Sequence, residues 1–172
     1  MHSLDRRAVL KLGLGASAFL AVAGLGASLS GCSQATPANG FAVLRDSDLA
    51  FLRALVPVML AGSTDAMPVA VEQTLQGLDS SLDHLSAPML KLTQQLFDVL
   101  TLPVTRGPLT GVWGSWQQAS PEQIEAFLQR WQGSSLNLLR QGHASLLQLV
   151  LMAWYGRPQA WAHCGYPGPP TV

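Results

Sequence analysis

The sequence predicts an all-α fold: a small bundle of about five helices, followed by an irregular C-terminal tail rich in aromatic residues, proline and glycine. Apolar residues recur three and four positions apart over several long stretches, which is the spacing of one helical face. Helix start and stop signals separate these stretches. The sequence lacks the alternating β-branched stretches that would predict strands.

The first helix is expected to begin at Asp46 or Ser47, because either side chain can cap a helix N-terminus. Pro57 is expected to bend or shorten this helix, and Gly62-Ser63-Thr64 to end it. Its apolar face consists of Leu52, Leu55, Val56 and Met59. The second helix is predicted by apolar residues in 4-3-4-3 spacing, namely Val71, Leu75, Leu78, Leu82 and Leu85.

The third helix is expected to start after Ser86 and Pro88. It is marked by apolar residues at helical spacing, namely Met89, Leu92, Leu96 and Val99. Pro103 and Gly107-Pro108 are expected to stop it, before a loop that holds Trp113 and Trp116.

The fourth helix has the sharpest local signal, Ser120-Pro121-Glu122-Gln123. Serine suits the cap, proline suits the first helical position, and glutamine can close a capping box. Its apolar face consists of Ile124, Phe127, Leu128 and Trp131.

The fifth helix is the longest, and we expect it to lie at the centre of the bundle. Gly156 and Pro158 are expected to end it. Its apolar face consists of Leu136, Leu139, His143, Leu146, Leu147, Val150 and Trp154.

Residues 1–31 are predicted to be an export signal. Arg6 and Arg7, followed by Leu10 and Lys11, are typical of a twin-arginine leader, which serves proteins that fold before export. The uncharged segment from residue 12 to residue 30 ends at Leu29-Ser30-Gly31-Cys32, which favours cleavage and lipid attachment at Cys32. Retention of the leader as a membrane anchor is the alternative, because its length approaches the roughly 20 residues of a span.

The rest of the chain divides into a flexible tether over residues 32–45 and a helical domain over residues 46–172. After residue 31 the chain has 7 basic and 9 acidic side chains. This balance excludes nucleic-acid binding, which needs a basic patch. The whole chain is 48% hydrophobic and only 12% charged, with 5 Trp, so we expect apolar surface that contacts a partner or a membrane.

The sequence has no haem-attachment motif, cysteine quartet, phosphate-binding loop or zinc-protease motif. We therefore expect no catalytic, cofactor or metal site in this chain, and no enzymatic activity of its own. His143 lies on an apolar face, where a histidine is more often structural than a ligand or a base. His163-Cys164 with His84 or His143 is a poor metal signal, because no second pair has a fixed spacing.

Cys164 has no partner within the chain if Cys32 carries lipid. An intermolecular disulfide, a free thiol and a buried inert cysteine are the alternatives. The surrounding tail combines aromatic side chains with rigid turns, as interface anchors do. The predicted partner interface comprises Trp154, Tyr155, Trp161, Cys164, Tyr166, Pro167, Gly168, Pro169 and Pro170.

These features together resemble the gluconate 2-dehydrogenase subunit 3 family, the small subunits of bacterial membrane-associated FAD-dependent dehydrogenases. The resemblance rests on the Arg6-Arg7 leader, the opening helix around Asp48–Pro57, and the tail from Trp154-Tyr155 through Trp161 to residues 165–170. The lipid-attachment sequence at Cys32 departs from many relatives, which look like simple secreted subunits.

The resemblance implies a non-catalytic small subunit that carries a folded GMC-type flavoprotein, with its FAD, through the twin-arginine route. That flavoprotein would oxidise a sugar, sugar acid or alcohol and pass electrons to a c-type cytochrome subunit. The expected location is the periplasm, with the chain attached to a membrane through Cys32. The alternative is a stand-alone helical lipoprotein that binds a small apolar ligand.

Overall fold

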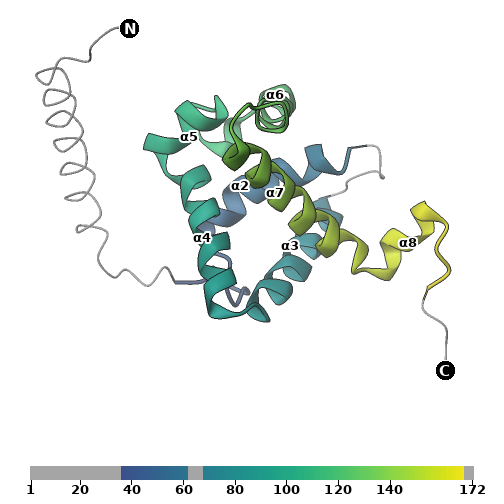
Figure 1. Cartoon of the computed structure of the whole chain (residues 1–172). Coiled ribbons are helices and arrows are strands. Elements are labelled where there is room, and N and C mark those ends of the chain that lie inside the picture. Colours follow the sequence, from purple (N-terminus) through teal and green to yellow (C-terminus); the bar gives the residue numbers. More distant parts are fainter. Residues whose placement is uncertain (1–35, 62–67, 169–172) are drawn as a thin grey trace, which may run out of the picture. The chain divides into compact units, whose positions relative to one another are not determined.

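Apolar residues at helical spacing produce an all-α architecture, as predicted (Figure 1). The computed structural model describes residues 36–61 and 68–168, and within these ranges the chain contains helices and no strands. The elements in chain order are α2 (Asp46–Met59), α3 (Pro68–Asp83), α4 (Ala87–Thr101), α5 (Pro103–Thr110), the 3-10 helix η1 (Trp116–Gln118), α6 (Pro121–Gln132), α7 (Asn137–Tyr155) and α8 (Pro158–Cys164).

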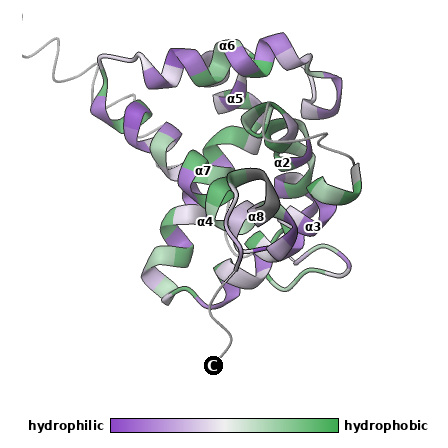
Figure 2. Ribbon diagram, turned by 90° about the vertical axis from the view of Figure 1, so that its right-hand side faces the viewer, coloured by the Kyte–Doolittle hydropathy of each residue, from purple (hydrophilic) through white to green (hydrophobic). Residues whose placement is uncertain are grey.

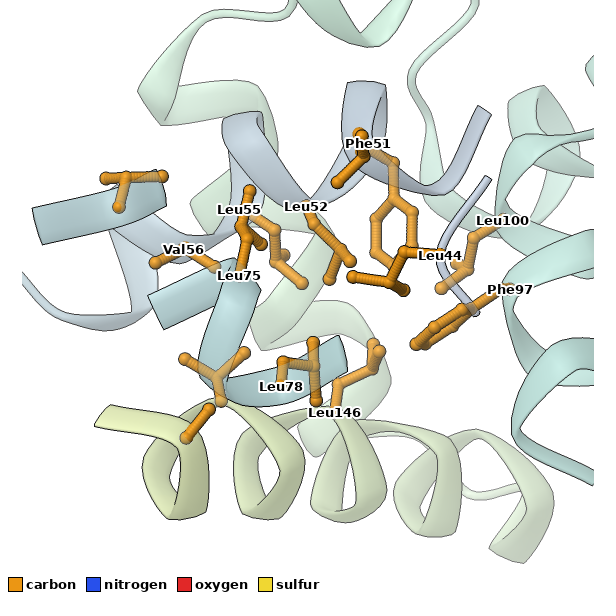
Figure 3. Packing of buried hydrophobic residues seen from close by; sticks show 14 of the residues in the cluster. Leu44, Phe51, Leu52, Leu55, Val56, Leu75, Leu78, Phe97, Leu100 and Leu146 are labelled. Carbon is orange, nitrogen blue, oxygen red and sulfur yellow. The ribbon is translucent and has the colours of Figure 1, made fainter. Parts of the chain in front are cut away.

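Helix α2 lies at the centre of the packing. It contacts α3, α4, α6, α7 and η1, whereas the main contacts of α7 are with α3 and α6. Helix α7, which is predicted to be central, forms the two most extensive helix pairs, with α3 and α6, and also contacts α2 and α8, so α2 and α7 share the central place. Figure 3 shows the α2 side chains against those of the neighbouring helices. The buried α2 residues that it labels are Phe51, Leu52, Leu55 and Val56.

A row of aromatic rings joins four elements through the core. Phe97 of α4 contacts Phe51 of α2 at a ring-centroid distance of 5.3 Å, and Phe51 contacts Trp116 of η1 at 5.9 Å. Trp116 contacts Phe127 of α6 at 6.0 Å, and Phe127 contacts Trp131 at 5.0 Å. Edge-to-face and tilted pairs of this kind add to the stability that comes from burying the rings.

Two helices lie where the sequence predicted a stop or an irregular tail. Helix α5 begins at Pro103 and ends at Thr110, followed by Gly111, whose φ of 82° is left-handed, and α8 begins at Pro158. A proline lacks the N–H that the first turn of a helix leaves unpaired, so it fits a helix start. Pro103 and Pro158 end one helix and begin the next.

The capping box predicted for α6 is confirmed. The Gln123 N–H donates to Ser120 Oγ at 3.3 Å, and the Ser120 N–H donates to Gln123 Oε1 at 3.0 Å. The predicted cap of α2 at Asp46 or Ser47 is wrong. The cap residue is Arg45, whose backbone N–H donates to the Asp48 carboxylate at 3.0 Å.

The segment before α2 is held against the helical domain. The backbone N–H groups of Ala42, Val43 and Leu44 donate to the Asp79 carboxylate of α3 at 2.7, 2.9 and 2.8 Å. Leu44 and Ala38 are buried. Residues 38–45 thus belong to the folded domain, and the predicted boundary between tether and domain moves from residue 45 to about residue 37.

The helices differ in how hydropathy is distributed over them. Figure 2 shows hydrophobic residues over much of α2 and α7, and hydrophilic residues along the exposed side of α6. None of the helices in residues 36–61 and 68–168 is both long and apolar enough to cross a membrane.

Candidate functional site

Helix α4 has two apolar sides, and the one that carries the predicted apolar row is largely exposed. Phe97 and Leu100 are the α4 side chains buried against α2, while Met89 and Leu92 are 52% and 59% exposed. Leu96 and Val99 are half-buried. This row marks the helix as predicted, whereas the α4 side chains buried in the core are Phe97 and Leu100 on the adjacent side.

Helix α7 repeats this arrangement. It buries Leu146, Val150 and Trp154, as predicted, together with Ala153. On the same predicted apolar face, Leu136 is exposed, and Leu139, His143 and Leu147 are half-buried. A second row in 4-3-4-3 spacing runs along the adjacent side, with Leu138 and Met152 77% and 61% exposed at its ends. This row consists of Leu138, Gly142, Ser145, Leu149 and Met152.

These two rows line one apolar groove, which we call the α4–α7 groove. It consists of two adjoining hollows of about 310 and 480 Å³ that share Met89, Thr93, Ser145 and Leu149. Leu78 and Leu82 of α3 and Leu85 contribute to the smaller hollow, and the ring of Trp131 contributes to the larger. No ionisable side chain lines either hollow among the described residues. The surface is suited to an apolar, uncharged partner.

A separate hollow of about 570 Å³ lies between α2 and α6. Its ionisable residues are Asp46 and Arg53, and Arg53 forms an ion pair with Glu72 of α3, with Nε and Oε1 2.6 Å apart. This charged rim distinguishes it from the α4–α7 groove.

Trp154 is the first residue of the predicted partner interface. Its side chain is only 4% exposed, so it cannot anchor a partner. The Arg157 guanidinium lies over its ring, with Cζ 5.0 Å from the ring centroid. Arg157 also donates to the Ala70 carbonyl at 2.8 Å and to Thr74 Oγ1 at 2.9 Å, and desolvation lowers its pKa. Trp154 therefore helps to attach the tail to α3, and the prediction of an interface role is wrong.

The remaining tail residues pack around Trp161. Its indole N–H donates to the Tyr155 carbonyl at 2.8 Å, and its ring contacts Tyr166 edge to face at 5.4 Å. Gly168, at a φ of 104°, lies against the same ring. Tyr155, Tyr166 and Pro167 are exposed, whereas Trp161 and Gly168 are half-buried. Pro169 and Pro170 lie outside the described residues.

Cys164 ends α8 with an exposed thiol, so the buried inert alternative is wrong. Its Sγ lies 3.2 Å from the Trp161 carbonyl, to which it can donate a hydrogen bond. An intermolecular disulfide and a free thiol stay as predictions.

The histidines considered as ligands lie in different environments. His84 is exposed, with Nδ1 2.7 Å from the Ser80 carbonyl, and His143 is half-buried on α7. The side chain of His163 lies outside the described part of the chain. Residues 36–61 and 68–168 contain no group of three or more potential metal-ligating side chains.

Two carboxylates, Asp79 and Asp48, have structural roles that were not predicted from the sequence. Asp79 binds the three N–H groups described above. Asp48 accepts two hydrogen bonds from the Arg45 guanidinium, whose Nη1 lies 2.7 Å from Asp98 of α4. The Asp48 hydrogen bond raises the pKa of Arg45. No local pattern indicates Asp79, because its donors lie more than 30 positions away in the sequence.

The predicted export and lipidation residues, Arg6, Arg7, Leu10, Lys11 and Cys32, lie outside the described residues. Comparison of the chain with protein-family models, with curated proteins and with solved structures finds no match.

Proposed function

We propose that this chain is a non-catalytic small subunit that binds a folded GMC-type flavoprotein and carries it through the twin-arginine route. The flavoprotein holds FAD and oxidises a sugar, sugar acid or alcohol, with a c-type cytochrome subunit as electron acceptor. Lipid on Cys32 keeps the complex at a membrane facing the periplasm. The substrate contacts belong to the flavoprotein.

The observation that carries this proposal is the α4–α7 groove. A chain of this size normally buries the apolar faces of its helices. Here two neighbouring helices expose large apolar side chains along a shared groove, including Leu92 and Leu138. Contiguous apolar surface of this kind is typical of protein-binding sites. Together with a leader that exports folded proteins, it supports a role as the carrier of a larger partner.

The alternative of a stand-alone lipoprotein predicts an enclosed cavity lined by aromatic side chains. The groove differs in both respects. Met89 and Met152 at its edge are more than half exposed, and its only aromatic contributor among the described residues is Trp131. This openness favours a macromolecular partner over a small enclosed ligand.

Replacing Arg6 and Arg7 by lysine tests the export role, because the twin-arginine route depends on the arginine pair. We expect both the variant and the FAD-containing chain that co-purifies with the tagged wild type to remain in the cytoplasm. Fractionation followed by immunodetection and flavin absorbance measures this. Export of the flavoprotein at the wild-type level would contradict the proposal, as would a wild-type protein that purifies from its native host as a flavin-free monomer.

Truncation after Gly165 tests the tail. We expect partner capture to weaken while the helical circular dichroism and the unfolding midpoint stay unchanged, because Tyr166, Pro167 and Gly168 lie outside the core. Full retention of the complex would show that the tail is no anchor.

A further inference from the structure

The α4–α7 groove is bounded by helices that do not pack along each other. The main contacts of α4 are with α2 and α5, and those of α7 are with α3 and α6. Each wall presents its apolar row at helical spacing over about 15–21 Å, from Met89 to Val99 on α4 and from Leu138 to Met152 on α7. Two such rows on either side of a groove match the ridges of a third helix.

The charges determine which face this third helix can insert. No described ionisable side chain lines the groove, and Asp98 of α4 is already paired with Arg45. A charged residue inserted here would be desolvated without a counterion, which is strongly unfavourable. The inserted face must therefore be uncharged and apolar.

The side chains at the mouth of the groove also fit a helix. Met89 and Met152 are unbranched and exposed, so they can adjust to a helix surface in the way that methionine-rich binding sites do. Gln95, Gln141 and Gln148 border the apolar rows. Their amides can donate and accept hydrogen bonds, and so can satisfy polar residues that flank an apolar stripe.

A strand is a poorer occupant, because β-augmentation needs an unpaired strand edge and the described elements are all helical. A second copy of this chain is also a poorer occupant. Within the described residues, α4 and α7 are the helices with more than one exposed large apolar side chain, and they already form the walls. A second copy would have to insert its own α4 or α7, each of which already forms a wall of that copy's groove.

We infer that the α4–α7 groove binds one amphipathic helix of the flavoprotein, which inserts an uncharged apolar stripe between α4 and α7. This inference rests on the proposed function and specifies which element of the partner is recognised. The residues that carry the contact are Leu92 of α4 and Leu138 and Met152 of α7.

The test uses the full-length protein with the FAD-containing chain that co-purifies with it. Leu92→Glu and Leu138→Glu place a carboxylate in the groove at exposed positions, so the fold should not change. Val104→Glu is the matched control, because Val104 is 78% exposed on α5 outside the groove. We expect each groove variant to weaken binding at least tenfold and the control to stay within twofold, with equal unfolding midpoints.

A photo-reactive amino acid at Leu138, followed by mass spectrometry of the cross-linked complex, identifies the occupant. A cross-link within an amphipathic helical segment of the flavoprotein supports the inference. A cross-link to a second copy overturns it, as does wild-type affinity of both groove variants, while the proposed function survives if the complex still forms. Failure of the wild-type protein to bind any flavoprotein overturns both.

Discussion

Replacing Asp79 by alanine is expected to lower the free energy of unfolding by about 3 kcal/mol. Three backbone N–H groups lose their acceptor in this variant. Leu44 is fully buried, so its unpaired N–H costs about 2 kcal/mol, within the range for a buried donor. Ala42 is exposed and Val43 half-buried, so water restores much of their bonding and they add about 1 kcal/mol together.

For a domain of this size, 3 kcal/mol corresponds to a fall of about 6–12 °C in the unfolding midpoint. Urea and thermal unfolding followed by far-UV circular dichroism measure both quantities. Asp83→Ala is the matched control, because Asp83 lies on the same helix with an exposed side chain, and its loss should change stability by less than about 0.5 kcal/mol. If the two variants were equally stable, the Asp79 carboxylate would not hold the segment before α2.

Two further predictions concern an exposed ion pair and two half-buried glycines. The hydrogen bond from Arg53 lowers the pKa of Glu72 below its ordinary 4.5, so the pair stabilises the fold above pH 4.5 and this contribution is lost as the pH falls through the lowered pKa. Glu72→Gln should therefore reduce stability by about 0.5 kcal/mol at neutral pH, and the difference from wild type in urea unfolding should vanish in acid; a constant difference would contradict this. Gly142→Ala should destabilise by about 1–3 kcal/mol despite better helix propensity, because the new Cβ would lie 2.5 Å from the buried ring of Trp131. Gly77→Ala, where the Cβ would lie 3.4 Å from its nearest neighbour, should instead stabilise by up to about 1 kcal/mol, and the same sign for both in thermal unfolding would refute the steric argument.

The elements that could be predicted from the sequence are those specified by neighbouring residues. The capping box of Ser120 and Gln123 needs only side chains three positions apart, and it forms as expected. The helical spacing of Val71, Leu75 and Leu78 likewise identifies the buried face of α3.

The choice between two apolar sides of one helix could not be predicted in the same way. Periodicity shows that α4 has an apolar row at Met89 and Leu92, but whether that row is buried depends on where α2 and α7 lie. Phe97 and Leu100 occupy the core position instead. The apolar row that the spacing identifies on α4 is therefore one wall of the candidate binding groove.

Helix α3 links the two features that the proposed function needs. Asp79, on one side of α3, binds the backbone of the segment before α2. Leu78 and Leu82, on an adjacent side, line the smaller hollow of the groove. Under the proposed function, α3 thus holds both residues 42–44, which follow the leader in the sequence, and part of the groove that binds the flavoprotein. Asp79→Ala should then weaken co-export of the flavoprotein more than it weakens binding in solution.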